Sequence, residues 1–208
     1  MGGVLSGGET SSKAWTSVVH RVLPSIYKIK VAGCDFNGSG SGFRLGKWIV
    51  TNRHVVENAK TVSYVDASGR TRALHRWYSS RSDDLAIISS LDQTEPSLGL
   101  ASGPAVGGDL VATGGYPLGG PQVSNRGRVI QLIPPLEPNE SKIKVIETSA
   151  AILPGDSGGP LLNVDGLVVG AMFALNLENG TYLAIPAARI EALLKADHSH
   201  PEIPAECN

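Results

Sequence analysis

The spacing of apolar residues divides the chain into a helical start, a long strand-rich part and a helical end. Trp15, Val18 and Val22 recur at the interval of one helix face, which predicts a helix over Ala14–Leu23. Pro24 is expected to end that helix, because proline cannot supply the amide that continued helical bonding needs.

From Ile26 onward the pattern changes to short apolar or alternating runs separated by turn residues. β-Strands give this pattern because successive side chains point to opposite faces of a sheet. The expected strands are Ile26–Val31, Gly42–Leu45, Trp48–Thr51, Thr61–Val65, Leu85–Ile88, Asp109–Thr113, Val129–Leu132, Ile143–Thr148, Pro160–Leu162, Leu167–Phe173 and Tyr182–Ile185. Many short strands with turns between them are typical of a β-sandwich or of β-barrels.

Two further segments complete the expected organisation. The polar, proline-containing segment Leu91–Ser102 is expected to join two halves of the strand region. Pro186 opens a last helix that continues to about Lys195, with Ile190 and Leu193 on one face. We therefore expect a flexible N-terminus and helix over 1–24, one folded domain over 25–200 with halves at about 25–102 and 103–186, and a tail over 201–208.

The composition narrows the classes of function. Of the 208 residues, 41% are apolar and 18% charged, which is typical of a folded domain. The net charge is −1, so we expect neither nucleic acid nor an anionic membrane surface as a partner. No stretch approaches the roughly 18 apolar residues of a membrane span. The start, MGGVLSGGE, lacks a signal peptide's basic and apolar regions, which leaves open a natural start or a piece of an exported chain.

The sharpest motif is the run from Gly155 to Pro160, GDSGGP, with Ser157 near its centre. A serine hydroxyl becomes a useful nucleophile only when a base takes its proton and donors stabilise the oxyanion that forms. Glycines adopt positive φ at little cost and can turn backbone amides toward one point. We predict Ser157 as nucleophile and an oxyanion hole over Gly155, Asp156 and Ser157, with the amides of Gly155 and Ser157 as donors. The alternative is a glycine-rich turn that happens to contain serine.

The base is expected to be a histidine, and His54 is the best placed of the five. It lies in TNRHVV, just after the strand WIVT, and precedes an apolar Val-Val pair, so we expect it near the end of a buried strand. His20 is expected on the surface of the first helix and His75 in a polar strand or loop. His198 and His200 form an HSH tail, for which exposure to solvent is a better interpretation than weak metal binding.

The third member is an acid that holds the histidine tautomer and stabilises the imidazolium. Asp83 and Asp84 both precede the apolar run LAII. An acid directly before a buried strand can be directed inward, so we choose Asp84 and expect Asp83 to be a solvated turn residue.

These three motifs, TNRHVV, DLAII and GDSGGPL, occur in the order His, Asp, Ser and resemble the chymotrypsin-like serine peptidases, above all their bacterial HtrA/Deg branch. GSGSGF, LLNVDGLVVGAMFA and YLAIPAARI also look like segments of that branch. The resemblance implies an all-β fold of two perpendicular six-stranded β-barrels, with a short N-terminal helix and a C-terminal helix. It also implies a cleft between the barrels, hydrolysis of peptide bonds through an acyl-enzyme, no metal and no cofactor.

Two departures from that branch concern the end of the chain and the cysteines. The HtrA proteins carry a PDZ domain after the protease, and no PDZ domain fits after Ser157 here. The count of two cysteines, Cys34 and Cys207, leaves a disulfide and two free thiols equally open. Their placement is similar to MarP-like actinobacterial peptidases. That resemblance implies a Cys34–Cys207 bridge, an exported or periplasmic location, and a membrane-anchoring segment earlier in the natural chain.

The resemblance also indicates where substrate binds. The specificity pocket is expected to involve Ala151, Ile152, Phe173, Ala174 and Leu175, with Phe173–Leu175 pairing with the substrate backbone. None of these residues is charged, so we expect cleavage after small to medium aliphatic residues. The alternatives are a binding or chaperone-like module on a protease scaffold, with weak or no turnover, and an esterase.

Overall fold

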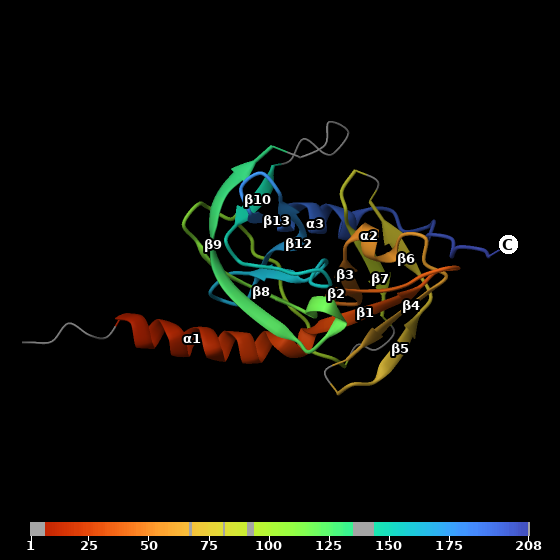
Figure 1. The fold of residues 1–208 in the computed structure, drawn as a ribbon, viewed down its shortest axis with the longest axis horizontal. Coiled ribbons are helices and arrows are strands. Elements are labelled where there is room, and N and C mark those ends of the chain that lie inside the picture. The colour runs from red at the N-terminus through yellow and green to blue at the C-terminus, as the bar shows by residue number, and fades with distance from the viewer. Residues whose placement is uncertain (1–6, 67, 81, 91–93, 135–143, 208) are drawn as a thin grey trace, which may run out of the picture.

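The predicted strands lie in two sheets, one formed by the first half of the chain and one by the second (Figure 1). The computed structural model describes residues 7–66, 68–80, 82–90, 94–134 and 144–207. Residues 1–6, where we expected a flexible start, and Ile143, where we expected a strand to begin, lie outside the described residues.

The first sheet has seven strands in the order β5-β4-β1-β2-β3-β7-β6. These strands are β1 (Ile26–Ala32), β2 (Asn37–Leu45), β3 (Trp48–Thr51), β4 (Thr61–Val65), β5 (Thr71–Leu74), β6 (Trp77–Ser79) and β7 (Ala86–Ser89). The alternation along β1 buries Tyr27, Ile29 and Val31 in a core and leaves Lys28 and Lys30 on the opposite face. One face of β1 is therefore apolar and the other is polar and open.

The second sheet is a closed barrel of six strands in the order β10-β13-β12-β11-β8-β9. These strands are β8 (Leu110–Gly115), β9 (Val123–Ile133), β10 (Val145–Thr148), β11 (Pro160–Leu162), β12 (Val168–Asn176) and β13 (Thr181–Pro186). The barrel interior is filled by apolar side chains, among them Leu161, Met172 and Ala184, which have no exposed surface. Closure removes the free edges that an open sheet would have.

A third apolar core joins the two halves. Phe43 and Leu85 of the first half pack in one cluster with Leu162, Val168 and Ile185 of the barrel. Because strands β3 and β7 are buried on both faces, they read as continuous apolar runs rather than alternating ones. This shared core fixes the loops at the junction, where the candidate site lies.

Within the described residues, five helical segments accompany the sheets. They are α1 (Gly7–Val22), the 3₁₀ turn η1 (Leu23–Ser25), α2 (Arg53–Val56), the 3₁₀ turn η2 (Pro117–Gly119) and α3 (Ala187–Lys195). In the part of α1 whose side chains the structure describes, residues 15–22, Trp15 and Val22 are buried. Ile190 of α3 is buried in the core between the halves. Among the helices that the structure describes, none has the length and apolar character needed to cross a membrane.

The all-β class, the two halves and the flanking helices are confirmed, with three differences. The first half is a seven-stranded sheet rather than a closed six-stranded barrel. Its strands β5 and β6 were not predicted, because their short, mixed sequences TRAL and WYS are only partly buried. Helix α1 begins at Gly7, earlier than the predicted Ala14. The early start was not predicted because the glycine, threonine and serine residues there have weak helix propensity.

The C-terminal tail packs along the first sheet instead of extending into solvent. Cys34 and Cys207 form a disulfide. The Glu202 amide donates to the Trp77 carbonyl at 2.8 Å, and the Ala205 amide to the Ala59 carbonyl at 3.0 Å.

The prediction of a solvated HSH tail is wrong for His198, which lies at the start of this segment. Its ring centre is 4.9 Å from that of Trp48 and 5.0 Å from that of Tyr78, and its Nε2 lies 2.8 Å from the Leu193 carbonyl oxygen. No local pattern indicated this contact, because both aromatic partners lie more than a hundred residues earlier in the chain.

Candidate active site

His54 lies where a buried strand turns into a short helix. Strand β3 ends at Thr51, and α2 follows after Asn52. Val55 and Val56 are buried and anchor α2 to the first half, while the His54 side chain keeps 45% of its surface exposed. The Val-Val pair thus holds the histidine at the surface of the junction, as its place in the sequence predicted.

The register of the neighbouring strand brings Asp84 to this histidine. Thr51 of β3 lies opposite Ala86 of β7 in an antiparallel pair, so residues after Thr51 run beside residues before Ala86. The His54 amide donates to Asp84 Oδ1 at 2.9 Å, and His54 Nδ1 lies 2.5 Å from Asp84 Oδ2. With the proton on Nδ1, the carboxylate orients the ring and leaves Nε2 free to accept another proton.

Asp83 points away from the histidine and pairs with the other half of the molecule. Its carboxylate accepts from the Ser80 hydroxyl at 2.9 Å and forms an ion pair with Arg189 of α3. The Asp83 and Arg189 side chains are only 13% and 12% exposed. The prediction that Asp83 is a solvated turn residue is therefore wrong, because a partner distant in sequence encloses it.

The loop of residues 153–159, here called the Ser157 loop, takes its shape from two glycines with positive φ. Gly155 has φ +99° and Gly158 has φ +86°. A Cβ on Gly155 would lie 2.6 Å from the Tyr116 carbonyl oxygen, and one on Gly158 would lie 2.2 Å from the Ser41 carbonyl oxygen. Glycine is therefore required at both positions for two reasons: the backbone conformation has positive φ, and neighbouring backbone leaves no room for a Cβ.

Hydrogen bonds on both sides place Ser157 between the two halves. The Ser41 amide of β2 donates to the Ser157 carbonyl at 2.8 Å, and the Gly158 amide donates to the Met172 carbonyl of β12 at the same distance. The next peptide approaches the chain before His54, since a Cβ on Gly158 would lie 3.0 Å from the Asn52 amide nitrogen. Ser157 and His54 are thus brought to the same part of the junction.

Within the described residues, no hydrogen bond of 3.5 Å or less joins the Ser157 hydroxyl to His54. Such a bond is often long in a serine site without substrate and shortens when the substrate binds. The hydrogen bonds between His54 and Asp84 are therefore formed, whereas the bond between His54 and the Ser157 hydroxyl is not.

Two amides of the Ser157 loop are available to a ligand. Among the described residues, neither the Gly155 amide nor the Ser157 amide has an acceptor within the chain. The Asp156 amide, by contrast, donates to the Leu153 carbonyl at 2.9 Å. The inclusion of Asp156 in the predicted oxyanion hole is not supported by this amide, since the tight turn from Leu153 already occupies it.

The Asp156 side chain is enclosed beneath the loop. The residue is 4% exposed, its Oδ2 accepts the Leu153 amide at 2.9 Å, and its Oδ1 has no partner among the described residues. A Cβ on Gly115 would lie 2.5 Å from Oδ1, so backbone packs against that oxygen. Burial raises the pKa of the Asp156 carboxyl, and the Leu153 amide opposes this rise in part.

We expect Asp156→Asn to become relatively more stable than the parent as the pH rises. Folding raises the pKa of Asp156, so folding favours its neutral form, and its contribution to stability is lost as pH increases through the folded value. Thermal unfolding of both proteins between about pH 4 and pH 8 measures this, since those values bracket ordinary and raised carboxyl pKa values. Asp35→Asn, at an exposed position, is the matched control.

Asp156 could act as a buried neutral carboxyl, or it could pair with a cation such as an N-terminal ammonium released by cleavage of the chain. N-terminal sequencing and an activity assay of the same samples separate these two roles. An unprocessed, active Asp156→Asn protein is expected if a neutral carboxyl suffices. A processed N-terminus in the active parent, together with a large loss of activity in the variant, would show instead that a cation pairs with Asp156.

The segment expected to bind substrate backbone presents an unpaired edge. On one side of β12, pairing with β11 ends at Ala171, while on the other side Ala174 and Leu175 pair with β13. Among the described strands, none covers the other edge of Phe173–Leu175. An extended peptide can add there as a further strand.

The five predicted specificity residues differ in how far they are exposed. Leu175 is 47% exposed, whereas Ile152 is 8% exposed and packs in the barrel core. Ala151 is intermediate in exposure, and its carbonyl accepts a hydrogen bond from the Asn125 side chain at 3.0 Å. Ile152 is thus part of the barrel core rather than of an open surface.

A buried glutamate supports the hairpin that follows this edge. Glu147 of β10 is 1% exposed and accepts from Thr181 at 2.6 Å, Gln131 at 2.7 Å and Asn179 at 2.6 Å. These bonds, that from Thr181 above all, hold the pKa of Glu147 below its usual range despite burial. The carboxylate therefore ties the turn between β12 and β13 to the barrel.

Sequence reasoning missed two polar residues that position the site, Ser41 and Asn52. The Ser41 hydroxyl donates to the Gly155 carbonyl at 2.7 Å and accepts the Tyr116 amide at 2.9 Å, so Ser41 holds the Ser157 loop through both its backbone and its side chain. The Asn52 side chain donates to the Asp84 carbonyl at 2.8 Å. Both are fully buried, and the only signal was a small or polar residue within otherwise strand-like sequence.

Comparisons with known proteins place these residues in a family. The family described as trypsin-like peptidase domain matches residues 38–170. A protein of Hahella chejuensis described as a DegP-like periplasmic serine endoprotease is 33% identical over 163 residues, 74% of this chain and 33% of that protein. The human serine protease HTRA4 is 31% identical over 199 residues, 88% of this chain and 41% of that protein. The chain thus spans about a third to two fifths of the length of these relatives.

A solved structure extends the likeness to the whole fold. The active form of the Rv3671c protease of M. tuberculosis superposes with a TM-score of 0.83 at 26% identity, covering 94% of this chain and 89% of that one. The matched family segment contains His54, Asp84 and Ser157. The chain therefore belongs to the trypsin-like peptidase domain family.

Proposed function

We propose that this chain is a serine endopeptidase with Ser157 as nucleophile, His54 as general base and Asp84 as the acid that orients His54. The observation that carries the proposal is the two-point contact of Asp84 with His54, through the amide and through Nδ1. This contact supports the proposal because it orients the histidine toward the junction that also holds the Ser157 loop, where two amides have no acceptor among the described residues. Membership of the trypsin-like peptidase domain family supports the same assignment.

The proposed reaction proceeds through an acyl-enzyme. His54 Nε2 takes the hydroxyl proton as Ser157 Oγ bonds to the carbonyl carbon of the cleaved peptide bond, and the amides of Gly155 and Ser157 stabilise the resulting oxyanion. His54 then gives the proton to the leaving amine as the C–N bond breaks. Water, with His54 again as base, hydrolyses the ester and restores Ser157. No step requires a metal or a cofactor.

We assign the protease unit to residues 25–200, with halves at about 25–102 and 103–186, the helix before it and the tail after it. Protein or peptide substrates and an exported, periplasmic or extracytoplasmic location are part of the proposal. The Cys34–Cys207 disulfide supports an oxidising compartment, and a relative is described as periplasmic.

A fluorophosphonate probe tests the proposal most directly. We expect covalent labelling at Ser157, detected by mass spectrometry of the peptide that contains it, and no labelling of Ser157→Ala. A casein digest measured alongside distinguishes an endopeptidase from an esterase, which would hydrolyse only activated esters. A parent protein that folds but is neither labelled nor active would favour the alternative of a binding or chaperone-like module.

We expect cleavage after small to medium aliphatic residues rather than after Lys or Arg. Ala151, Phe173, Ala174 and Leu175 offer no carboxylate to compensate the desolvation of a cationic side chain. In peptides that differ only at the residue before the cleaved bond, kcat/KM should be roughly 10- to 100-fold higher for valine than for lysine. A peptide-library digest dominated by cleavage after Lys or Arg would overturn this specificity without affecting the assignment of the three catalytic residues.

A further inference from the structure

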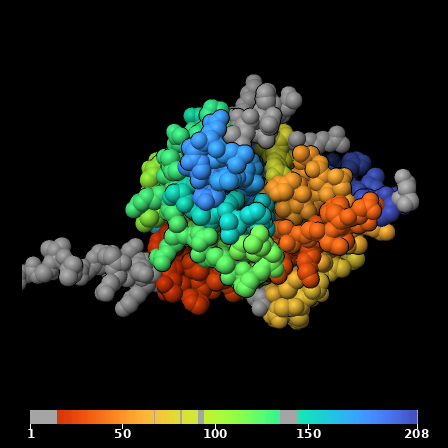
Figure 2. All heavy atoms as spheres, in the orientation of Figure 1, coloured from red at the N-terminus to blue at the C-terminus, as the bar shows by residue number. Residues whose placement is uncertain are grey.

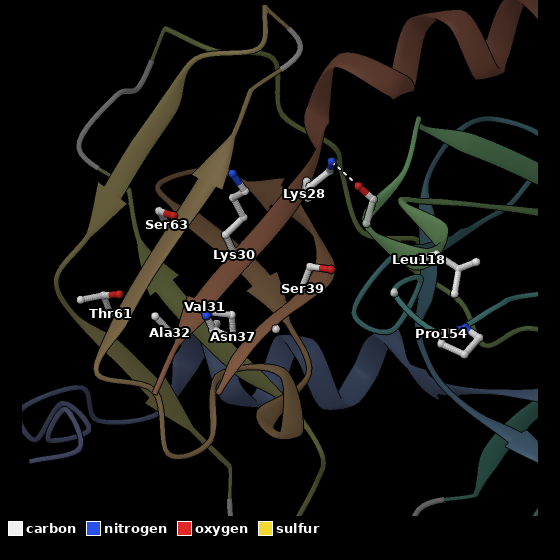
Figure 3. Close-up of a pocket in the computed structure, with 13 residues that line it drawn as sticks. Lys28, Lys30, Val31, Ala32, Asn37, Ser39, Thr61, Ser63, Leu118 and Pro154 are labelled. Atoms are coloured by element: carbon white, nitrogen blue, oxygen red, sulfur yellow. Dashed lines mark hydrogen bonds between the residues drawn. The ribbon is translucent and has the colours of Figure 1, made fainter. Parts of the chain in front are cut away.

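A pocket of about 670 Å³ lies next to the Ser157 loop, and of its lining residues only Gly155 has a part in the mechanism above. Its floor is the open face of three adjacent strands, β4, β1 and β2, and its other wall contains Leu118, Gly119, Pro154 and Gly155 (Figure 3). Figure 2 shows the same junction on the surface, where the orange first half borders the green part of the second half. The pocket thus joins the first sheet to the residue proposed as an oxyanion donor.

The strand register explains why this floor is polar. Lys30 of β1 lies opposite Ser39 of β2 and Ser63 of β4, and Ala32 lies opposite Asn37 and Thr61 in the same way. Since side chains alternate along each strand, all of these fall on the face opposite the apolar core. The pocket is therefore a polar sheet surface enclosed by the loops of the barrel, not a gap in a core.

The charge of the pocket is positive. Among the described residues that line it, two are lysines and none is acidic. The Lys28 ammonium donates to the Gly119 carbonyl at 2.5 Å and lies 5.5 Å from the centre of the Tyr116 ring, which commits it to the wall (Figure 3). Lys30 is exposed and has no hydrogen-bond or ion-pair partner among the described residues. Its charge is thus free to pair with a ligand.

The position of the pocket relative to Ser157 indicates which part of a bound peptide substrate would enter the pocket. The candidate specificity residues and the unpaired edge of Phe173–Leu175 belong to the barrel side, which would hold the residues before the cleaved bond. Ser157 is bonded to β2 on its other side, through Ser41. An extended peptide that crosses Ser157 from the barrel therefore continues over β2 toward Asn37 and Ser39, into the pocket.

Distances along the strands set the position. Lys28 lies opposite Ser41, level with the nucleophile, and Lys30 is two residues further along β1, about 7 Å away. From Lys28 to Ala32 the floor extends about 13 Å, the length of roughly four extended residues. We propose that this pocket binds the leaving-group side of the peptide substrate and that Lys30 selects an acidic side chain at the second or third residue after the cleaved bond. The inference rests on the proposed function.

Matched peptides test it. They share one sequence before the cleaved bond and carry Asp or Asn at the second or the third residue after it. At low ionic strength the parent should show a kcat/KM about three- to fivefold higher for Asp at one of these positions, the size of an exposed ion pair. Salt should reduce the preference, because it screens exposed charges. Lys30→Gln should abolish it, and Lys30→Glu should favour peptides with Lys at that position.

Lys47→Gln is the matched control, since Lys47 is in the turn between β2 and β3, away from the pocket lining, and lies 5.1 Å from the Trp48 ring. It should keep the preference for Asp. Equal kcat/KM for Asp and Asn peptides in an active parent, or a preference that Lys30→Gln retains, would overturn the inference while the proposed function stands. If the parent cleaves none of the peptides and no probe labels Ser157, the proposed function fails and this inference with it.

Discussion

Asp84→Asn should lower kcat by about 10⁴-fold, and Ser157→Ala by roughly 10⁴- to 10⁶-fold, if the three residues act as one catalytic unit. Asparagine can keep the bond from the His54 amide, but its side-chain NH₂ favours the wrong tautomer of the ring. His54 Nε2 would then carry the proton that it should accept from Ser157. Single-turnover and steady-state kinetics on a cleavable peptide, with Tm as a check on folding, measure both losses.

Asp83→Asn provides the matched control, since it removes the same charge one residue earlier. Asp83 pairs with Arg189 and does not contact His54, so its loss should lower Tm while kcat changes less than about tenfold. The asparagine can still bond Ser80, but Arg189 would lose its charged partner. If Asp83→Asn abolishes activity in folded protein while Asp84→Asn does not, the choice of acid is wrong.

The three proposed catalytic residues could be located from the sequence because their chemistry demands a local context. His54 needs a strand end behind it and an anchor after it, and Ser157 needs glycines that permit positive φ. These requirements appear within a few residues of each position. The all-β class could be predicted for a similar reason, since turn residues separate each strand from the next, whereas the arrangement in two barrels was implied by the family resemblance.

The remaining features depend on partners that are distant in the chain. Ser41 positions the Ser157 loop across a separation of more than a hundred residues, and Arg189 encloses Asp83 from a helix that closes the other half. Strand β5 was missed because it is defined by pairing with β4 rather than by its own apolar pattern. Hydrogen bonds and ion pairs of this kind carry no periodicity, so only the three-dimensional structure brings them together.

Reduction of the Cys34–Cys207 disulfide should lower the free energy of unfolding by up to about 5 kcal/mol. The cysteines are 173 positions apart, so the bridge restricts nearly the whole unfolded chain, and the loss of closure entropy is large for so long a loop. For a chain of this size the loss corresponds to a fall in Tm of roughly 10–20 °C. Residual structure in the denatured state reduces the effect, so this is an upper figure.

The bridge should also matter locally, because it holds the tail on the first sheet. Ala205 bonds Ala59, just beyond the helix that carries His54, and Glu202 bonds Trp77 of β6. Reduction should therefore raise amide hydrogen exchange in the tail and beside α2 before it affects the barrel. Melting with and without reductant, with the double variant Cys34→Ser/Cys207→Ser as a control that reductant cannot change, measures the global effect. Thiol titration checks that the Cys34–Cys207 disulfide is formed. Protein exported by its native host and kept free of reductant should contain no reactive thiol, and two reactive thiols would show that the disulfide is absent.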